Sequence, residues 1–399
     1  MSYPSPPLFK TRLACAGLLL ASASASQALD YNGYFRAGPG LTSGSASRAC
    51  YALNGGSSGI KYRLGNECDF YGEFQLSQPF KKDGIEYRAT LMVNHYTGAT
   101  EPAAGKNADK KLEIEQMFAE ARGFDIAPLA TFWIGRERGR RGDVHIVDTF
   151  FTEMVGVGAG FRGQPLGGGQ IGAAFYKTDS DAARPGNRLN VEYVGLPVNP
   201  NGALNVFLTA TKGDFTGGTS GAGVTLRHDQ SKLFGTSLSN TLWLQYAQGS
   251  AGLNSNFGDL SAGSKARSWR IVESFNGQSG RVGGQAILLL ASEKNGAGVR
   301  TDSASVGGRI SYGVTKNFKF VAELGTSQYK PEGGATARLT KLTLAPTLSI
   351  DDGFWSRPEF RLYATSAKWN SAAGNVTGQA AFAGKTSGTS YGAQVEFWF

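Results

Sequence analysis

The sequence predicts an all-β fold, a transmembrane antiparallel β-barrel with a wet interior. Apolar and polar residues alternate along many short segments, as strands with one apolar and one polar face require. Glycine is frequent, at 56 of 399 residues, whereas proline is scarce, at 14, and only 18% of residues are charged. Beyond residue 28 the longest wholly apolar run, about 286–291, is far too short for a membrane-spanning helix. A membrane protein of this composition has to cross the bilayer with strands.

The first 28 residues have the features of a cleaved export signal. Lys10 and Arg12 give a positive start, and a short stretch of apolar and small residues, Leu13–Ala25, follows. The Ser-Gln-Ala sequence at 26–28 fits the small-x-small cleavage rule, and the apolar part is too short to span a bilayer. Cleavage there leaves 399 − 28 = 371 residues. The predicted division is a signal peptide over 1–28 and one barrel domain over 29–399.

The end of the chain shows the alternation most clearly. In Tyr391–Phe399 the odd positions carry tyrosine, alanine, valine and two phenylalanines, whereas the even positions carry glycine, glutamine, glutamate and tryptophan. A strand directs these two sets to opposite faces, one suited to lipid and one to water. A soluble edge strand can share this pattern, but it recurs between turn-rich stretches such as 199–202 and 331–334. The recurring segments are 30–37, 69–76, 242–246, 318–324 and 359–364.

Charged residues on the polar face of these segments indicate that this face sees water. A soluble β-sandwich would have a packed interior and a polar exterior, whereas a large membrane barrel has an apolar exterior and a wet interior. No helical domain, linker or long low-complexity tract interrupts the pattern. The sequence therefore predicts a single barrel after the signal.

Net charge and cysteine content bear on partners and compartment. The formal net charge is +9, or 9 − 2 = +7 without Lys10 and Arg12, which favours anionic solutes or lipopolysaccharide as contacts. Nucleic acid is not expected as a partner, because the exported chain has no basic helix or aromatic-basic motif. Cys15 lies in the signal, so Cys50 and Cys68 remain. An even number of cysteines in an oxidising compartment predicts a disulfide, with two free thiols as the alternative.

Catalysis is not expected from this sequence. A hydrolase needs an activated nucleophile and a base, and only His95, His145 and His228 are available as histidine bases. The chain contains no G-x-S-x-G elbow, and it has no C-x-x-C or H-E-x-x-H pattern for a metal. No enzymatic activity, metal or cofactor is therefore predicted.

Four stretches of the chain carry a resemblance to a known family: 61–68 (KYRLGNEC), 143–148 (DVHIVD), 355–369 (WSRPEFRLYATSAKW) and 391–399 (YGAQVEFWF). They resemble the maltoporin family, the LamB-type sugar-specific porins of the bacterial outer membrane. The resemblance implies an integral outer-membrane barrel of about 18 strands, a homotrimer, and a loop folded inward to constrict the pore. It also implies a disulfide in the first surface loop, onto which Cys50 and Cys68 fall. The implied function is facilitated passive diffusion of maltose- or maltodextrin-like sugars.

The same resemblance implies a sugar-binding site with two devices. Tyr34, Tyr71 and Trp398 match an aromatic lane that stacks on the apolar faces of sugar rings, and strand parity independently places all three on the wet face. The matching polar and constriction positions are Arg36, Arg63, Glu73, Arg141, Asp143, His145, Asp148 and Phe150. Such charged groups bind sugar hydroxyls, and weak contacts allow release as well as entry. The alternative is a salt-bridge network that braces the wall, with His145 as a structural hydrogen-bonding residue.

This chain departs from the family pattern at several positions. Phe150 stands where the family has a constriction tyrosine, and Ala119 stands where an arginine is expected. No tryptophan occurs in 98–111, and no aromatic residue lies near 303–305 or at Val224. About three of six lane aromatics therefore remain, which predicts weaker binding of maltodextrins or a preference for another sugar.

Two further features leave the solute open. Trp243 faces the wet side by parity and is a candidate replacement for a missing lane aromatic. The presumed constriction loop is basic, with Arg136, Arg138, Arg140 and Arg141, which indicates either a solvated loop or a preference for anionic solutes. A general or anion-preferring non-specific porin is the closest alternative, and a purely structural or adhesive barrel is a more distant one.

Overall fold

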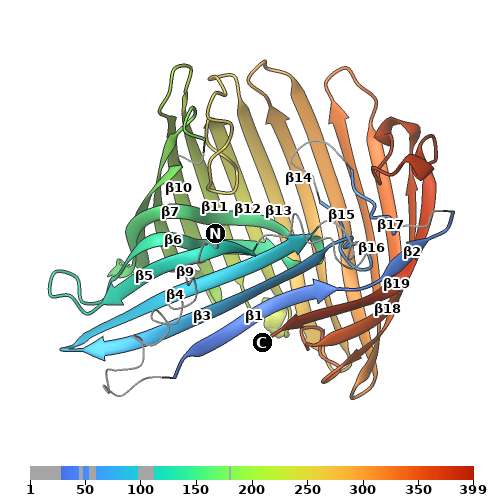
Figure 1. Cartoon of the computed structure of the whole chain (residues 1–399), viewed down its shortest axis with the longest axis horizontal. Coiled ribbons are helices and arrows are strands. Elements are labelled where there is room, and N and C mark those ends of the chain that lie inside the picture. The colour runs from blue at the N-terminus through green and yellow to red at the C-terminus, as the bar shows by residue number, and fades with distance from the viewer. Residues whose placement is uncertain (1–27, 45–47, 54–59, 98–111, 179–180) are drawn as a thin grey trace, which may run out of the picture.

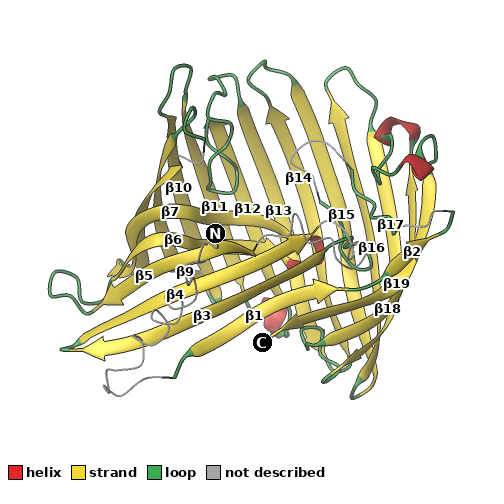
Figure 2. Ribbon diagram, viewed as in Figure 1, coloured by secondary structure: helices red, strands yellow, loops and turns green. Residues whose placement is uncertain are grey.

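The computed structural model describes residues 28–44, 48–53, 60–97, 112–178 and 181–399, so the predicted signal peptide lies almost wholly outside the described residues. Strands make up most of the regular structure (Figure 2). The strands are β1 (Asp30–Ala37), β2 (Gly40–Thr42), β3 (Phe70–Lys82), β4 (Ile85–Thr97), β5 (Leu112–Arg122), β6 (Thr131–Val144), β7 (Thr149–Leu166), β8 (Gly169–Thr178), β9 (Gly186–Asn199), β10 (Gly202–Gly213), β11 (Ser220–Gln230), β12 (Ser239–Gly249), β13 (Arg267–Ser279), β14 (Val282–Lys294), β15 (Arg300–Thr315), β16 (Phe318–Pro331), β17 (Ala337–Ser349), β18 (Glu359–Trp369) and β19 (Ser387–Trp398).

Short 3-10 turns supplement the strands. In the described ranges these are η1 (His145–Val147), η2 (Leu233–Gly235), η3 (Ser371–Ala373) and η4 (Ala380–Phe382). No helix in this described part of the chain is long and apolar enough to cross a membrane.

The strands form one closed antiparallel sheet, with the barrel wall visible in Figure 1. Both β1 and β2 pair with β19, so they are two halves of one barrel strand. The 19 labelled strands therefore count as 19 − 1 = 18 strands of the barrel wall. Closure occurs at β1, where Tyr34 lies opposite Trp398 of β19 and opposite Glu73 of β3. The predicted fold class, an antiparallel barrel of about 18 strands, is therefore confirmed.

Alternation of side chains fixes the two faces of the wall. In β18, Phe360 and Leu362 are 56% and 64% exposed on the outside, whereas Glu359, Arg361 and Tyr363 are buried on the inside. Because successive side chains of a strand point to opposite faces, the apolar set of each strand forms the outer surface. This outer surface has the composition that lipid requires.

The interior is drier than the sequence predicts. On β15–β19 the inward charges are buried and paired: Glu323 lies 2.7 Å from Arg309 and 3.0 Å from Lys341, and Lys319 lies 2.7 Å from Glu359. The expectation that this face sees water is wrong for this part of the wall. Chain segments folded into the barrel cover it, and each buried charge is compensated by a partner of opposite sign.

One of these segments, residues 60–69, is called the docking loop below. Leu64 accepts a hydrogen bond at its carbonyl from Lys341 Nζ at 2.7 Å, and its backbone N–H donates to Glu323 at 2.9 Å. The ring of Tyr62 lies against Gly307 and Gly325, which are paired directly across β15 and β16. Only residues without a Cβ allow a ring to approach the wall so closely, so these two glycines form the seat of the loop.

The second inward segment is the hairpin of β6, η1 and β7, called the constriction hairpin below. Its tip residues Ile146 and Phe151 are fully buried in an apolar cluster with Trp243 of β12 and Ile287 of β14. Ile146 N–H donates to Gln285 at 3.1 Å, which fixes the tip against the opposite wall. The predicted inward-folded constriction loop is therefore present.

Candidate functional site

The three predicted lane aromatics lie next to one another on the inner wall. Trp398, Tyr34 and Tyr71 belong to the neighbouring strands β19, β1 and β3, and each side chain is partly exposed. Tyr34 lies opposite Trp398, and Tyr71 lies opposite Arg36, two residues further along β1. This is toward the end of the barrel at which residues 43–69 connect β2 to β3, called the long-loop end below. The Tyr34 and Tyr71 ring centroids are 6.0 Å apart. These three rings lie on adjacent strands of the inner wall, and we call them the aromatic lane.

A buried ion-pair network lies beside the lane, with Glu396 at its centre. This fully buried carboxylate lies 3.0 Å from Arg63 and 2.8 Å from Arg357, and it also pairs closely with Arg361. Tyr34 donates its hydroxyl hydrogen to Glu396 at 3.1 Å. The network therefore fixes the orientation of the Tyr34 ring through its hydroxyl group.

Arg36 extends this network toward the constriction hairpin. Its guanidinium lies 2.9 Å from Glu67, 2.9 Å from Asp69 and 2.8 Å from Asp148. Two of these acids come from the docking loop and one from the hairpin tip, so Arg36 ties three segments together. Arg36 and Arg63, both predicted for the polar track, are buried and engaged by acids, and both also brace the structure.

The constriction hairpin presents charged residues to the interior. Arg141 and Asp143 are exposed, and the Arg141 guanidinium lies 4.0 Å from the ring centroid of Phe150. Arg141 makes no ion pair with any described residue. Glu73 on β3 is partly exposed and lies 2.5 Å from Arg138. The predicted residues that remain available to a passing solute are thus Arg141, Asp143 and Glu73, with Asp148 partly exposed.

The basic cluster lies on β6 itself rather than in a loop. Arg136 pairs with Glu115 at 3.7 Å and Arg140 with Glu192 at 2.9 Å, and Arg138 bridges Glu73 and Glu115. Only Arg141 of the four lacks an acidic partner among the described residues. The cluster is therefore mostly neutralised by neighbouring strands.

Trp243 does not replace a missing lane aromatic. Its side chain points inward as parity requires, but it is only 2% exposed and packs against Phe151 at a centroid distance of 5.4 Å. The constriction hairpin covers it, so the replacement hypothesis is wrong. Trp355 is an aromatic residue that the sequence reasoning did not assign: it is 42% exposed and contacts His145 at 5.4 Å. Trp355 lies in the 355–369 stretch that resembles the maltoporin family, and this position could have marked it as a candidate site residue.

His145 lies between two arginines. Its Nδ1 is 3.2 Å from Arg63, and its Nε2 is 3.2 Å from Arg357 and 3.6 Å from Glu396. A neutral imidazole accepts at one nitrogen and donates at the other. Arg63 and Arg357 can only donate, so a neutral His145 accepts from one of the two arginines, and Glu396 at 3.6 Å is beyond hydrogen-bond distance. Burial, aided by the charge of Arg63 and opposed by Glu396, lowers the pKa of His145 to about 4.

This pKa predicts a pH dependence of stability. Because it lies below the ordinary value of 6.5, the contribution of His145 is fully present above about pH 6.5 and is lost as the pH falls through 4. The loss arises because the unfolded chain takes up this proton at a higher pH than the folded chain does. Urea unfolding of the wild type and His145→Asn at pH 7, 5 and 4 measures it. Equal acid sensitivity of the two proteins would contradict the assignment.

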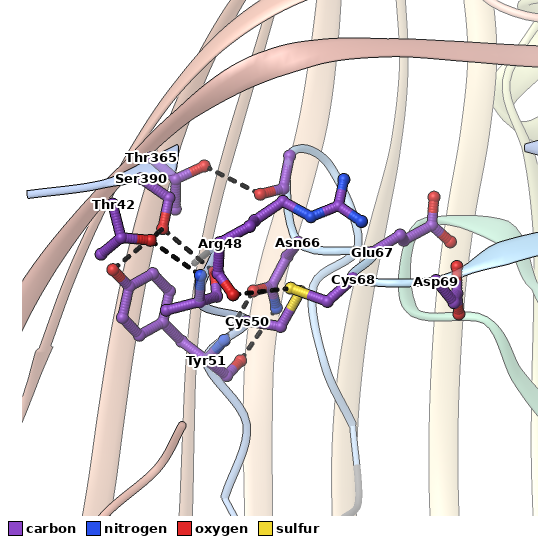
Figure 3. Close-up of a disulfide and its surroundings, with 12 residues drawn as sticks. Thr42, Arg48, Cys50, Tyr51, Asn66, Glu67, Cys68, Asp69, Thr365 and Ser390 are labelled. Carbon is purple, nitrogen blue, oxygen red and sulfur yellow. Dashed lines mark hydrogen bonds between the residues drawn. A yellow bond between two sulfur atoms is a disulfide. The ribbon is translucent and has the colours of Figure 1, made fainter. Parts of the chain in front are cut away.

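The two cysteines of the described chain anchor the root of the docking loop. Cys50 and Cys68 form a disulfide with a Cα–Cα distance of 5.8 Å, the pair that the resemblance implies. Asn66 clamps the same region, because its side chain accepts from Tyr51 N–H at 2.7 Å and donates to the Tyr51 carbonyl at 2.8 Å (Figure 3). The disulfide thereby helps to hold Glu67 and Asp69 in position for their ion pairs with Arg36.

Within the described ranges, no three His, Cys, Asp or Glu side chains are arranged to hold a metal ion.

A closed wall with an apolar exterior, a charged interior and an inward-folded hairpin defines a class of protein. It is a channel-forming β-barrel of the outer membrane. Residues 29–399 match the sequence model described as LamB porin, and the chain belongs to the LamB porin family. The predicted family and the predicted location, integral in the outer membrane, are confirmed.

Solved outer-membrane proteins share the fold. The chain is similar to OpdK of Pseudomonas aeruginosa, solved with vanillate, with a TM-score of 0.53 and 12% identity over 93% of this chain and 98% of that one. It is also similar to OccAB2 of Acinetobacter baumannii, with a TM-score of 0.50 and 11% identity over 93% and 98%. At such identities the likeness concerns the barrel fold alone.

Proposed function

We propose that this porin carries out facilitated passive diffusion of carbohydrates, maltose-like or related sugars, along the aromatic lane. The observation that carries the proposal is the contiguity of Trp398, Tyr34 and Tyr71 on three adjacent strands, each ring partly exposed inside the barrel. A pyranose has apolar C–H faces and a rim of hydroxyls, so flat aromatic side chains bind the faces.

Polar groups beside the lane suit the hydroxyl rim. Glu73 and Asp148 are partly exposed acceptors, and Arg141 and Asp143 are exposed on the constriction hairpin. Ionised groups make stronger hydrogen bonds than neutral ones, and several weak, exchangeable contacts permit release. The lane spans three rings only, which favours short saccharides over long maltodextrins.

The aromatic lane predicts a specific loss of sugar binding. Tyr71→Leu removes the flat ring and should weaken saturable block of ion current by maltotriose about fivefold, since stacking is worth ~1 kcal/mol. Tyr71→Phe, which loses only the hydroxyl bonded to Glu73, is the matched control and should retain most of the block. Single-channel recording in planar bilayers measures both variants.

The same recordings separate the proposal from a general or anion-preferring porin. The exposed Arg141, without an acidic partner among the described residues, favours this alternative. Graded reduction of current by every sugar according to size, with no saturation in the wild type, would replace carbohydrate selectivity by general diffusion.

We further propose that the protein assembles as a homotrimer in contact with outer-membrane lipid and lipopolysaccharide. Membership of the LamB porin family supports the trimer. The apolar outer face of the described strands supports the lipid contact, and the net charge of 9 − 2 = +7 without Lys10 and Arg12 supports attraction to anionic lipopolysaccharide.

A further inference from the structure

A cavity of about 510 Å³ lies inside the barrel near its long-loop end, apart from the aromatic lane. It is bordered by Phe150 of the constriction hairpin, by residues of the 250–266 loop, and by the inner faces of β13, β14 and β15. Arg270 and Glu293 face it from β13 and β14. The volume lies within the range of roughly 300–1,000 Å³ typical of small-molecule sites.

Arg270 is a buried cation that makes no direct ion pair with any described residue. It is only 5% exposed, its Nε donates to Gln245 at 2.9 Å, and its guanidinium lies 4.7 Å from the ring centroid of Phe151. Its Nη2 is buried without a hydrogen-bond partner, and no described carboxylate pairs with it. Unpaired buried charge is costly, so a native structure that keeps one calls for an explanation.

The cavity also offers groups for the rest of a ligand. Phe150 supplies an aromatic edge to the cavity, with Arg141 stacked on its ring. Glu293 is partly exposed and makes no ion pair with the described residues, so its carboxylate can accept hydrogen bonds from hydroxyls. Asp259, the other acid that borders the cavity, is engaged by Ser261 and Arg184.

We propose that this cavity is a binding subsite for sugar acids. The carboxylate of a hexuronate would bind Nη1 of Arg270, the guanidinium nitrogen that is neither closed off nor hydrogen-bonded, its hydroxyls would donate to Glu293, and its ring would lie against Phe150. A simple anion would gain the contact to Arg270 but meet repulsion from Glu293, whereas a neutral sugar would leave Arg270 unpaired. The inference rests on the proposed carbohydrate function and names the acidic sugars as its preferred class.

The test measures block of single-channel current by glucuronate, glucose and acetate added on the long-loop side. Glucuronate should block the wild-type trimer or monomer at a concentration roughly tenfold lower than glucose, because a charge-assisted contact is added. Arg270→Gln should abolish this difference, and Arg270→Lys should retain part of it. Arg122→Gln, which removes the same charge from an exposed pair with Glu86, should leave it unchanged.

The outcomes distinguish this subsite from the aromatic lane. Arg270→Gln with an undiminished glucuronate preference overturns the subsite, and so does acetate block as strong as glucuronate block. Loss of glucose and maltotriose block in the wild type, with Arg270-dependent glucuronate block intact, overturns the lane and leaves the subsite standing.

Discussion

Glu396→Gln is expected to destabilise the folded barrel by about 3–5 kcal/mol, because it removes one partner from a buried charge network. The fully buried carboxylate is the shared counter-charge of Arg63, Arg357 and Arg361. Glutamine keeps the shape and one acceptor oxygen but leaves the three guanidinium groups with excess positive charge. Urea unfolding of the barrel in lipid vesicles measures the change. The variant should also open and close irregularly in bilayers, since Tyr34 loses its anchor.

An exposed acid provides the matched control for Glu396. Glu86 pairs with Lys81 at 3.2 Å and with Arg122 at 2.5 Å near a short turn. Exposed pairs contribute little to stability, so Glu86→Gln should unfold almost as the wild type does. If the two glutamine variants had the same unfolding midpoint, the buried network would not be the support that its geometry indicates.

Gly325→Ala is expected to release the docking loop and raise single-channel conductance. A Cβ at this position would lie 2.0 Å from Cδ2 of the Tyr62 ring, so the ring has to leave its seat. Overpacking of this kind costs about 1–3 kcal/mol, and the ring also loses its 2.9 Å hydrogen bond to Ser305. Because the loop fills part of the interior, its displacement widens the path for ions.

Two further variants make this result interpretable. Gly72→Ala is the matched control, because its nearest atom, Cβ of Phe35, is 3.6 Å from the added methyl group, an ordinary contact. Tyr62→Ala removes the same interaction from the side of the loop and should raise conductance in the same direction. Wild-type conductance in both Gly325→Ala and Tyr62→Ala would show that the loop does not limit the pore.

The candidate site shows where the residue pattern was sufficient. Parity alone indicated that Tyr34, Tyr71 and Trp398 face inward, and the structure gives all three that direction with partial exposure. The same rule indicated an inward Trp243, but not that Phe151 would cover it. Arg138 belongs to a basic cluster in the sequence, but the residue pattern did not indicate that it bridges Glu73 and Glu115.

The sequence by itself determined the barrel, its two faces and its family. The direction of side chains alternates every two residues along a strand, and each family motif can be recognised from a few consecutive residues. Tertiary structure alone decided which inward residues meet water. Tyr62 reaches Gly325, and Glu396 reaches Arg63, across long stretches of chain that no local pattern connects. The direction of a side chain is a property of its own strand, whereas its exposure depends on which distant segment folds over it.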